Sequence, residues 1–291
     1  MASDENNACY RAPPGSCDCH MHVFGDPVHY PYSAERRNSP PAAALQKFLE
    51  DYLAIAVSLG IERMVFVQPS TYGRDNSCMV DAMKQLGGNV RGIVDIDAST
   101  SETELDRLHK AGVRGVRINA GPPSRAVDST LMSKVLPRLT RMDSLCAEIG
   151  WQLDLLGPSW LYEEMHDTLK TLRSSFTVAH FGMFRGQNGA DSPAFKRFLE
   201  LLQHGERRCW VKLTAPYRIG SPPVYEDAVP IARALIKAAP DRVIWGSDYP
   251  FLSHADRVNA VGLFNLIPTW APDESVRKQL LVDNPRTLFG F

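Results

Sequence analysis

Short apolar runs recur along the chain with the spacing of a repeating strand and helix unit. Eight runs are rich in Val, Ile and Phe, which is typical of buried strands. Between most of them, apolar residues return every three or four positions, which predicts amphipathic helices. The predicted strands are Cys17–Val23, Arg63–Gln68, Val90–Ile96, Val113–Asn119, Trp151–Leu156, Phe176–Phe181, Cys209–Leu213 and Arg242–Trp245.

The helical segments end at glycine or just before glycine or proline. A glycine after a helix can adopt the left-handed conformation that closes the last turn. Strands that alternate with helices predict a parallel sheet, and eight such units favour a closed (β/α)8 TIM barrel. An open doubly wound sheet is the alternative, but no Gly-x-Gly-x-x-Gly follows the first strand. The predicted helices are Ala42–Leu59, Glu102–Ala111, Leu131–Ile149, Pro193–Gln203 and Ala228–Ala239.

No repeat, low-complexity tract or long linker interrupts this pattern. We therefore expect a polar N-terminal arm at residues 1–15 and a single barrel domain at residues 16–291. The C-terminal segment Pro272–Phe291 is predicted to be a capping helix followed by a docking tail, Asn284–Phe289.

Charge excludes several classes of partner. The chain has 32 Lys and Arg against 33 Asp and Glu, a formal charge of −1, so we expect no nucleic-acid or anionic-membrane partner. No run approaches the roughly 18–20 apolar residues of a membrane helix. The first 15 residues lack the basic start and apolar core of a secretory signal, which favours a cytoplasmic protein with free thiols. The oligomeric state is left open.

Candidate chemistry lies at the ends of the strands, where barrel enzymes place their active sites. His20 and His22 alternate on the first strand and therefore share a face. Two imidazoles in an apolar strand are costly unless they bind something or each other, although satisfied core histidines are the alternative. His180 closes the sixth strand, and Asp248 follows the eighth between apolar flanks.

Arginines and hydroxyl groups at other strand ends suggest an anion-binding pocket. Arg117 shares a face with Asn119, and a buried guanidinium needs an anion, either a protein carboxylate or a substrate carboxylate. The loop after the second strand is rich in hydrogen-bonding groups, which fits either a capped turn or a binding loop. The predicted substrate-binding residues are Arg117, Arg125, Arg185, Ser70, Tyr72, Asn76 and Tyr217.

These residues resemble the amidohydrolase superfamily, amidohydrolase-2 type. Within it the chain is similar to the branch of 2-pyrone-4,6-dicarboxylate lactonase and 4-sulfomuconolactone hydrolase. That branch also looks similar to sugar-acid lactonases and to a galactarolactone isomerase. The motifs are Asp18-x-His20-x-His22-Val23-Phe24, Val67-Gln68-Pro69-Ser70, Gly112-Val113-Arg114-Gly115-Val116-Arg117, His180-Phe181-Gly182 and Arg242-Val243-Ile244-Trp245-Gly246-Ser247-Asp248.

The chain departs from its metal-dependent relatives at two positions. The fourth strand has no lysine to bridge two metals, and Trp151–Leu156 has no metal-binding histidine. The resemblance therefore implies a lactonase that requires no cofactor. Zinc at His20, His22 and Asp248 is the alternative, since three protein ligands plus water can form a catalytic zinc site.

The resemblance implies hydrolysis of a small anionic lactone, carboxylate- or sulfonate-bearing, in the catabolism of aromatic compounds. We expect Asp248 to be the general base, and His20, His22 and His180 to stabilise charge on the carbonyl oxygen. The arginines would bind the acidic groups of the substrate. Three alternatives are a decarboxylase of a small aromatic or muconate-like acid, a lactone isomerase, and a non-catalytic protein that binds organic anions.

Overall fold

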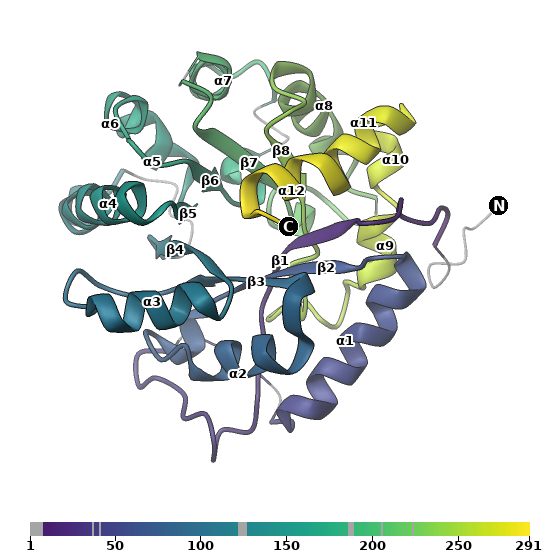
Figure 1. The fold of residues 1–291 in the computed structure, drawn as a ribbon. Coiled ribbons are helices and arrows are strands. Elements are labelled where there is room, and N and C mark those ends of the chain that lie inside the picture. The colour runs from purple at the N-terminus through teal and green to yellow at the C-terminus, as the bar shows by residue number, and fades with distance from the viewer. Residues whose placement is uncertain are drawn as a thin grey trace. The chain divides into compact units, whose positions relative to one another are not determined.

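The strands form one sheet in which each neighbours the next in the sequence (Figure 1). The computed structural model describes residues 8–36, 38–40, 42–121, 127–185, 189–204, 206–222 and 224–291. The strands of this described part are β1 (Cys17–Met21), β2 (Arg63–Val67), β3 (Val90–Val94), β4 (Val113–Asn119), β5 (Gln152–Leu156), β6 (Phe176–Val178), β7 (Cys209–Leu213) and β8 (Val243–Trp245).

Helices occupy most of the connections between these strands. Together with the strand order β1 to β8, this alternation defines the (β/α)8 class and confirms the predicted fold class. The helices are α1 (Leu45–Leu59), α2 (Ser77–Leu86), α3 (Glu102–Lys110), α4 (Ser129–Ile149), α5 (Ser159–Glu164), α6 (His166–Lys170), α7 (Pro193–His204), α8 (Val229–Ala238), α9 (Ala260–Phe264), α10 (Ile267–Trp270), α11 (Glu274–Lys278) and α12 (Asn284–Phe289).

All eight predicted strands are confirmed; β1, β3 and β6 end two or three residues earlier than predicted, and β2, β5 and β8 are shorter by one residue. β6 stops at Val178 because His180–Met183 form a tight turn with positive φ values. Helices α2, α5, α6, α9 and α10 were not predicted. The segment predicted as a docking tail is instead helix α12, with Pro285 in its first turn, where a missing N–H costs nothing.

The chain divides into two compact units, and the first holds the start and the end of the sequence. Unit 1 consists of Met1–Asp95, Thr100–Arg114 and Trp245–Phe291. In it, β1 pairs in parallel with β2 and β2 with β3. The segment after β8 joins β1 through two backbone hydrogen bonds, Asp248 N–H to His20 O at 2.8 Å and His22 N–H to Tyr249 O at 2.9 Å.

Part of the predicted N-terminal arm packs against unit 1. The Tyr10 ring stacks on Phe264 with centroids 4.6 Å apart, and the Ala12 N–H donates to Leu59 O. The domain boundaries at residues 15 and 16 stay a prediction, but the described residues of the arm have fixed partners.

Unit 2 consists of Ile96–Ser99 and Gly115–Ile244. Its strands pair in parallel from β4 to β7, and the register places Arg117 beside Asp154 and Asp154 beside Thr177. Neighbouring residues in register point to the same side of a parallel sheet. Polar side chains from three strands therefore gather on one side.

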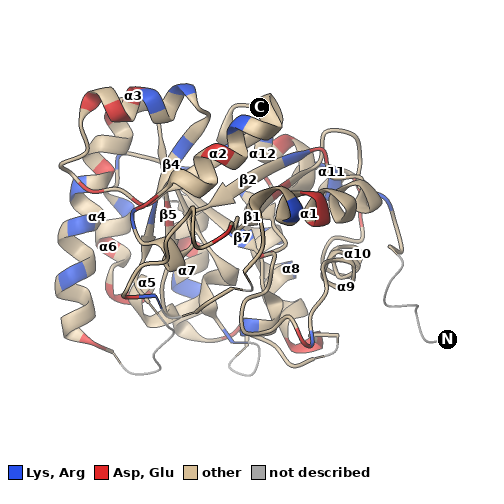
Figure 2. Ribbon diagram, turned by 90° about the horizontal axis from the view of Figure 1, so that it is seen from below, with Lys and Arg blue, Asp and Glu red and all other residues tan. Residues whose placement is uncertain are grey.

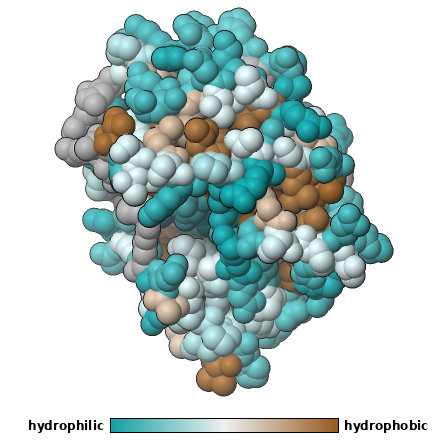
Figure 3. All heavy atoms as spheres, turned by 90° about the vertical axis from the view of Figure 1, so that its left-hand side faces the viewer, coloured by the Kyte–Doolittle hydropathy of each residue, from teal (hydrophilic) through white to brown (hydrophobic). Residues whose placement is uncertain are grey.

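Charged side chains lie mainly on helices such as α3 and α4 (Figure 2). The α3 ion pairs Arg107–Glu104 and Lys110–Asp106 are largely exposed, so each contributes little to stability. Hydrophilic residues cover most of the face in Figure 3, with hydrophobic ones in separate patches. All six cysteines are free, as predicted. Among the described residues, no helix has the length and hydropathy of a membrane span.

Candidate active site

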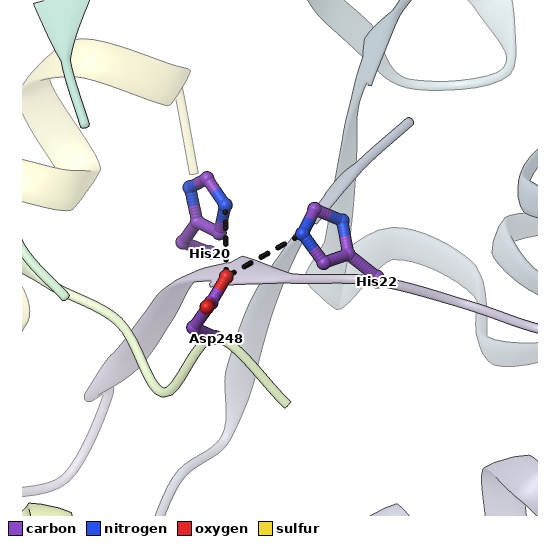
Figure 4. Close-up of side chains that lie close together, drawn as sticks. All are labelled: His20, His22 and Asp248. Atoms are coloured by element: carbon purple, nitrogen blue, oxygen red, sulfur yellow. Dashed lines mark ion pairs between the residues drawn. The ribbon is translucent and has the colours of Figure 1, made fainter. Parts of the chain in front are cut away.

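His20, His22 and Asp248 come together in unit 1, as the sequence predicts (Figure 4). The Nε2 atoms of His20 and His22 each lie 3.4 Å from Oδ1 of Asp248. His20 and Asp248 are buried, whereas the His22 side chain keeps 13% of its exposure. The cluster can therefore be reached from solvent along the His22 ring, while its carboxylate is shielded from bulk water.

The local backbone explains how these residues meet. The pairing of β1 with β2 shifts register between Asp18 and Met21, so the strand is irregular where the histidines lie. Asp248 adopts φ 63°, a left-handed conformation that aspartate tolerates better than most residues. This turn directs its carboxylate toward the two imidazoles in Figure 4.

The hydrogen bond of His22 determines which ring nitrogen carries a proton. Its Nδ1 lies 2.7 Å from Val67 O, and a carbonyl oxygen can only accept, so Nδ1 donates. In the neutral ring, Nε2 then presents a lone pair toward the Asp248 carboxylate. This arrangement suits either an imidazolium or a cation held between the two groups, since metal-binding histidines typically donate their other N–H to a carbonyl or carboxylate.

The three side chains could hold a metal ion. One ligand atom from each of His20, His22 and Asp248 lies within 4.8 Å of the others. The donor set of two imidazoles and a carboxylate is one that zinc accepts. The residues thus fit the alternative that the sequence left open.

His180 lies in unit 2, directly after β6. Its Nδ1 is 2.6 Å from Oγ1 of Thr214, and its backbone N–H donates to the same oxygen at 3.2 Å. Both side chains are buried, and His180 has φ 55°. Thr214 therefore fixes both the backbone and the ring of His180.

Arg117 is buried near a protein carboxylate. Asp154 on β5 is fully buried, pairs with Lys212 on β7 and accepts a hydrogen bond from Thr177 at 2.9 Å. Burial alone would raise the pKa of Asp154, but the positive charges of Lys212 and Arg117 hold it below its ordinary value. The expectation that Arg117 lies near an anion is met within the protein. Both cations act on this carboxylate.

The predicted binding residues after β2 differ in their surroundings. Ser70 is exposed, whereas the buried Tyr72 hydroxyl accepts the Gly25 N–H at 3.0 Å. The Asn76 amide bonds the backbone of Asp95 on both sides, donating at 2.9 Å and accepting at 3.0 Å. Tyr72 and Asn76 thus anchor neighbouring loops.

The remaining predicted residues follow β4, β6 and β7. Arg185 is exposed and Tyr217 is half-buried, with the Arg218 guanidinium 5.6 Å from its ring centroid. Arg125 lies outside the described residues.

Sequence reasoning gave no role to Asp18, Thr214, Asp154 or Lys212. Asp18 stands in the quoted His-x-His motif, and a charged residue in an apolar strand was a usable signal. Asp154 and Lys212 are also charged residues in apolar strands, but that signal does not show that they pair, because their contact depends on the register of β5 to β7.

The fold and the site define a (β/α)8 barrel with a histidine and carboxylate cluster at its strand ends. The family model described as Amidohydrolase matches residues 17–291, and the chain belongs to this family. The chain is 37% identical over 284 residues to 4-sulfomuconolactone hydrolase of Hydrogenophaga intermedia, covering 96% of this chain and 89% of that one.

Two further comparisons agree. The chain is 34% identical over 290 residues to 2-pyrone-4,6-dicarboxylate hydrolase of Comamonas testosteroni, covering 96% of this chain and 92% of that one. An apo crystal structure from Agrobacterium tumefaciens superimposes with a TM-score of 0.84 at 27% identity, covering 97% of each chain. The resemblance inferred from the motifs is confirmed at the level of the family.

Proposed function

We propose that this protein hydrolyses a small anionic lactone, with Asp248 as the general base. The observation that carries the proposal is the cluster of two imidazoles around one buried carboxylate. The names of relatives that match nearly the whole chain support it, because they are hydrolases of sulfomuconolactone and of a pyrone dicarboxylate. The same names support our proposal of a role in the catabolism of aromatic compounds.

Asp248 would accept a proton from the attacking water and return it to the oxygen of the opened ring. Its left-handed backbone and its hydrogen bond to His20 O hold the carboxylate in place before substrate arrives. A base fixed in this way loses little entropy on reaching the transition state.

The histidines would stabilise negative charge on the carbonyl oxygen. Because Nδ1 of His22 already donates to Val67 O, His22 can donate through Nε2 only as an imidazolium. His20 and His180 are our further proposed donors, and Thr214 orients His180. Such preorganised donors are typically the largest single contribution to rate enhancement.

Arg117 is the first of the proposed substrate-binding residues. Its buried guanidinium would bind a carboxylate or sulfonate of the substrate through charge-assisted hydrogen bonds. We also keep Arg125, Arg185, Ser70, Tyr72, Asn76 and Tyr217 as proposed binding residues. The hydrogen bonds of Tyr72 and Asn76 favour an indirect role for both through the loops that they hold.

A divalent metal such as zinc would be held by His20, His22 and Asp248. When bound, it would supply a Lewis acid that polarises the lactone carbonyl. The lactonase proposal itself requires no cofactor, since the same residues can act as base and donors.

The direct test is a screen of dicarboxylate, sulfonated and sugar-acid lactones with a pH indicator, followed by product mass. Hydrolysis adds one water, isomerisation leaves the mass unchanged, and decarboxylation releases carbon dioxide. For the best substrate, Asp248→Asn should lower kcat by about 10²–10⁴-fold, the usual contribution of a general base. Asp273→Asn is the matched control, because asparagine can still cap α11.

An Asp248→Asn enzyme with wild-type kcat would remove Asp248 as the base. Arg117→Met should raise KM more than it lowers kcat if Arg117 only anchors the anion. Chelation followed by metal analysis decides the cofactor question, because activity that vanishes and returns with zinc would establish a metal requirement.

A further inference from the structure

Asp18 lies beneath the proposed site and accepts hydrogen bonds from three residues. Its side chain is 1% exposed. Oδ1 accepts the backbone N–H of His20 at 3.1 Å and that of Ser247 at 2.9 Å, and Oδ2 accepts the Tyr52 hydroxyl at 2.7 Å. These donors on both oxygens offset the cost of burying the carboxylate, so Asp18 is a satisfied buried group.

The donors come from three segments that are distant in the sequence. His20 lies on β1, Ser247 directly precedes Asp248, and Tyr52 lies on α1. One carboxylate oxygen thus links the backbone of a proposed catalytic histidine to the residue adjoining the proposed base. Two backbone bonds, from Asp248 N–H to His20 O and from His22 N–H to Tyr249 O, complete the link.

The position of this link matters because β1 is irregular there. Its pairing with β2 shifts register between Asp18 and Met21. Regular hydrogen bonds between the two strands therefore do not fix the position of His20 along the strand. The Asp18 carboxylate supplies a substitute on the opposite edge, toward the turn after β8. Tyr52 stays a donor, because burial and the nearby Asp18 raise its pKa well above the ordinary value.

We infer that Asp18 is a positioning residue, which holds the His20 backbone and the Ser247–Asp248 turn at the separation that the proposed chemistry needs. Asp18 acts through the backbone and makes no contact with the substrate. The inference rests on the proposed function for its kinetic consequence, but the geometric part stands alone. Displacements of about 1 Å in such groups can cost about 10²-fold in rate.

Three variants test the role of the carboxylate. Asp18→Ala removes all three acceptor contacts and should lower kcat by about 10²-fold, with KM nearly unchanged. Asp18→Asn keeps an oxygen for His20 and Ser247, while its amide can donate to Tyr52, so it should recover most of kcat. Tyr52→Phe removes one donor and should lower kcat less than Asp18→Ala does.

Asp143 provides a matched control in unit 2. It is also a buried carboxylate that binds a loop, accepting from the Arg173 N–H, the Ser174 N–H and the Ser174 hydroxyl. Asp143→Ala should lower Tm at least as much as Asp18→Ala does, but leave kcat of the folded enzyme unchanged. A merely structural role for Asp18 predicts the same behaviour in both variants.

A measurement without substrate separates this inference from the proposed function. The imidazole ¹⁵N resonances of His20 and His22 should move in Asp18→Ala and stay in place in Asp143→Ala. If the wild type opens no lactone while these resonances move, the proposed function fails and the positioning role stands. Unchanged kcat and unchanged resonances in Asp18→Ala would overturn the inference. If Asp18→Ala does not fold, wild-type kcat and resonances in Tyr52→Phe overturn it instead.

Discussion

Two buried carboxylates, one in each unit, are stabilised in opposite ways. Asp18 of unit 1 is surrounded by neutral donors from His20, Ser247 and Tyr52. Asp154 of unit 2 is surrounded by cations, Lys212 in direct contact and Arg117 nearby. Both residues are at most 1% exposed, so burial alone does not distinguish them.

Their pKa values shift in opposite directions for this reason. Burial raises the pKa of Asp18 by more than the hydrogen bonds from Ser247, Tyr52 and His20 lower it. For Asp154, burial acts in the same direction, but the charges of Lys212 and Arg117 outweigh it and the pKa falls. Neutral donors fix the position of the Asp18 carboxyl group, whereas the cations stabilise the ionised form of Asp154.

This difference matches the proposed roles of the two groups. The Asp18 contacts connect the backbone of His20 to that of Ser247, next to the proposed general base Asp248. The Asp154 contacts hold Lys212 and Arg117 in a buried place, and Arg117 is the residue that we propose to bind the anionic substrate. The two proposed roles therefore differ: the Asp18 contacts would align residues, whereas the cations beside Asp154 would attract an anion.

The largest effect is expected when the cation that contacts Asp154 is removed. Lys212→Met leaves a buried carboxylate without its direct partner, which typically costs about 3–5 kcal/mol of unfolding free energy. Urea denaturation at pH 7 measures the loss. The double variant Lys212→Met with Asp154→Leu should recover only part of it, because apolar groups can replace the Lys212–Asp154 pair but the buried Arg117 loses a nearby carboxylate. A single variant of wild-type stability would contradict the assignment.

The sequence predicted the scaffold better than these contacts. Apolar runs locate every strand, and the alternation of His20 and His22 predicts that they share a face, where both lie beside Asp248. The pairing of Lys212 with Asp154 depends on the register of three strands, which periodicity does not determine. Sequence reasoning left open whether Arg117 faces a protein or a substrate anion, and only the fold reveals Asp154 nearby. Tyr52 and Ser247 meet Asp18 across long stretches of chain, so no local pattern signals that contact.

A second, smaller effect is the pH dependence of Asp154→Asn. The folded pKa of Asp154 lies below the unfolded value of about 3.9, so the unfolded state binds more protons between the two. The stability that this carboxylate contributes is complete above the unfolded value and is lost as pH falls through the folded one. The difference in unfolding free energy between wild type and Asp154→Asn, measured in urea, should therefore be largest at neutral pH and decrease in acid. A gap independent of pH would contradict the lowered pKa.

The difference in unfolding free energy between wild type and Asp18→Asn should depend on pH with the opposite sign, and it should be smaller. The folded pKa of Asp18 lies above the unfolded value, so the folded state binds more protons between the two. Wild-type stability then falls as pH rises through that interval, and the asparagine variant does not follow. Urea midpoints at several pH values from 4 to 7 should show that the stability of Asp18→Asn relative to the wild type increases toward pH 7. If its relative stability decreases instead, the hydrogen bonds lower the pKa of Asp18 by more than burial raises it.

The smallest expected effect comes from an exposed pair with the same chemistry as Lys212 and Asp154. Lys47 contacts Asp51 one turn along α1, but the two side chains are 64% and 50% exposed. Solvent screens this attraction, and holding two long side chains together costs entropy. Lys47→Met should leave the urea midpoint unchanged within error, under the conditions in which Lys212→Met is strongly destabilised. Comparable losses in both variants would mean that removing any lysine is harmful, and that burial is not what makes the pair in unit 2 matter.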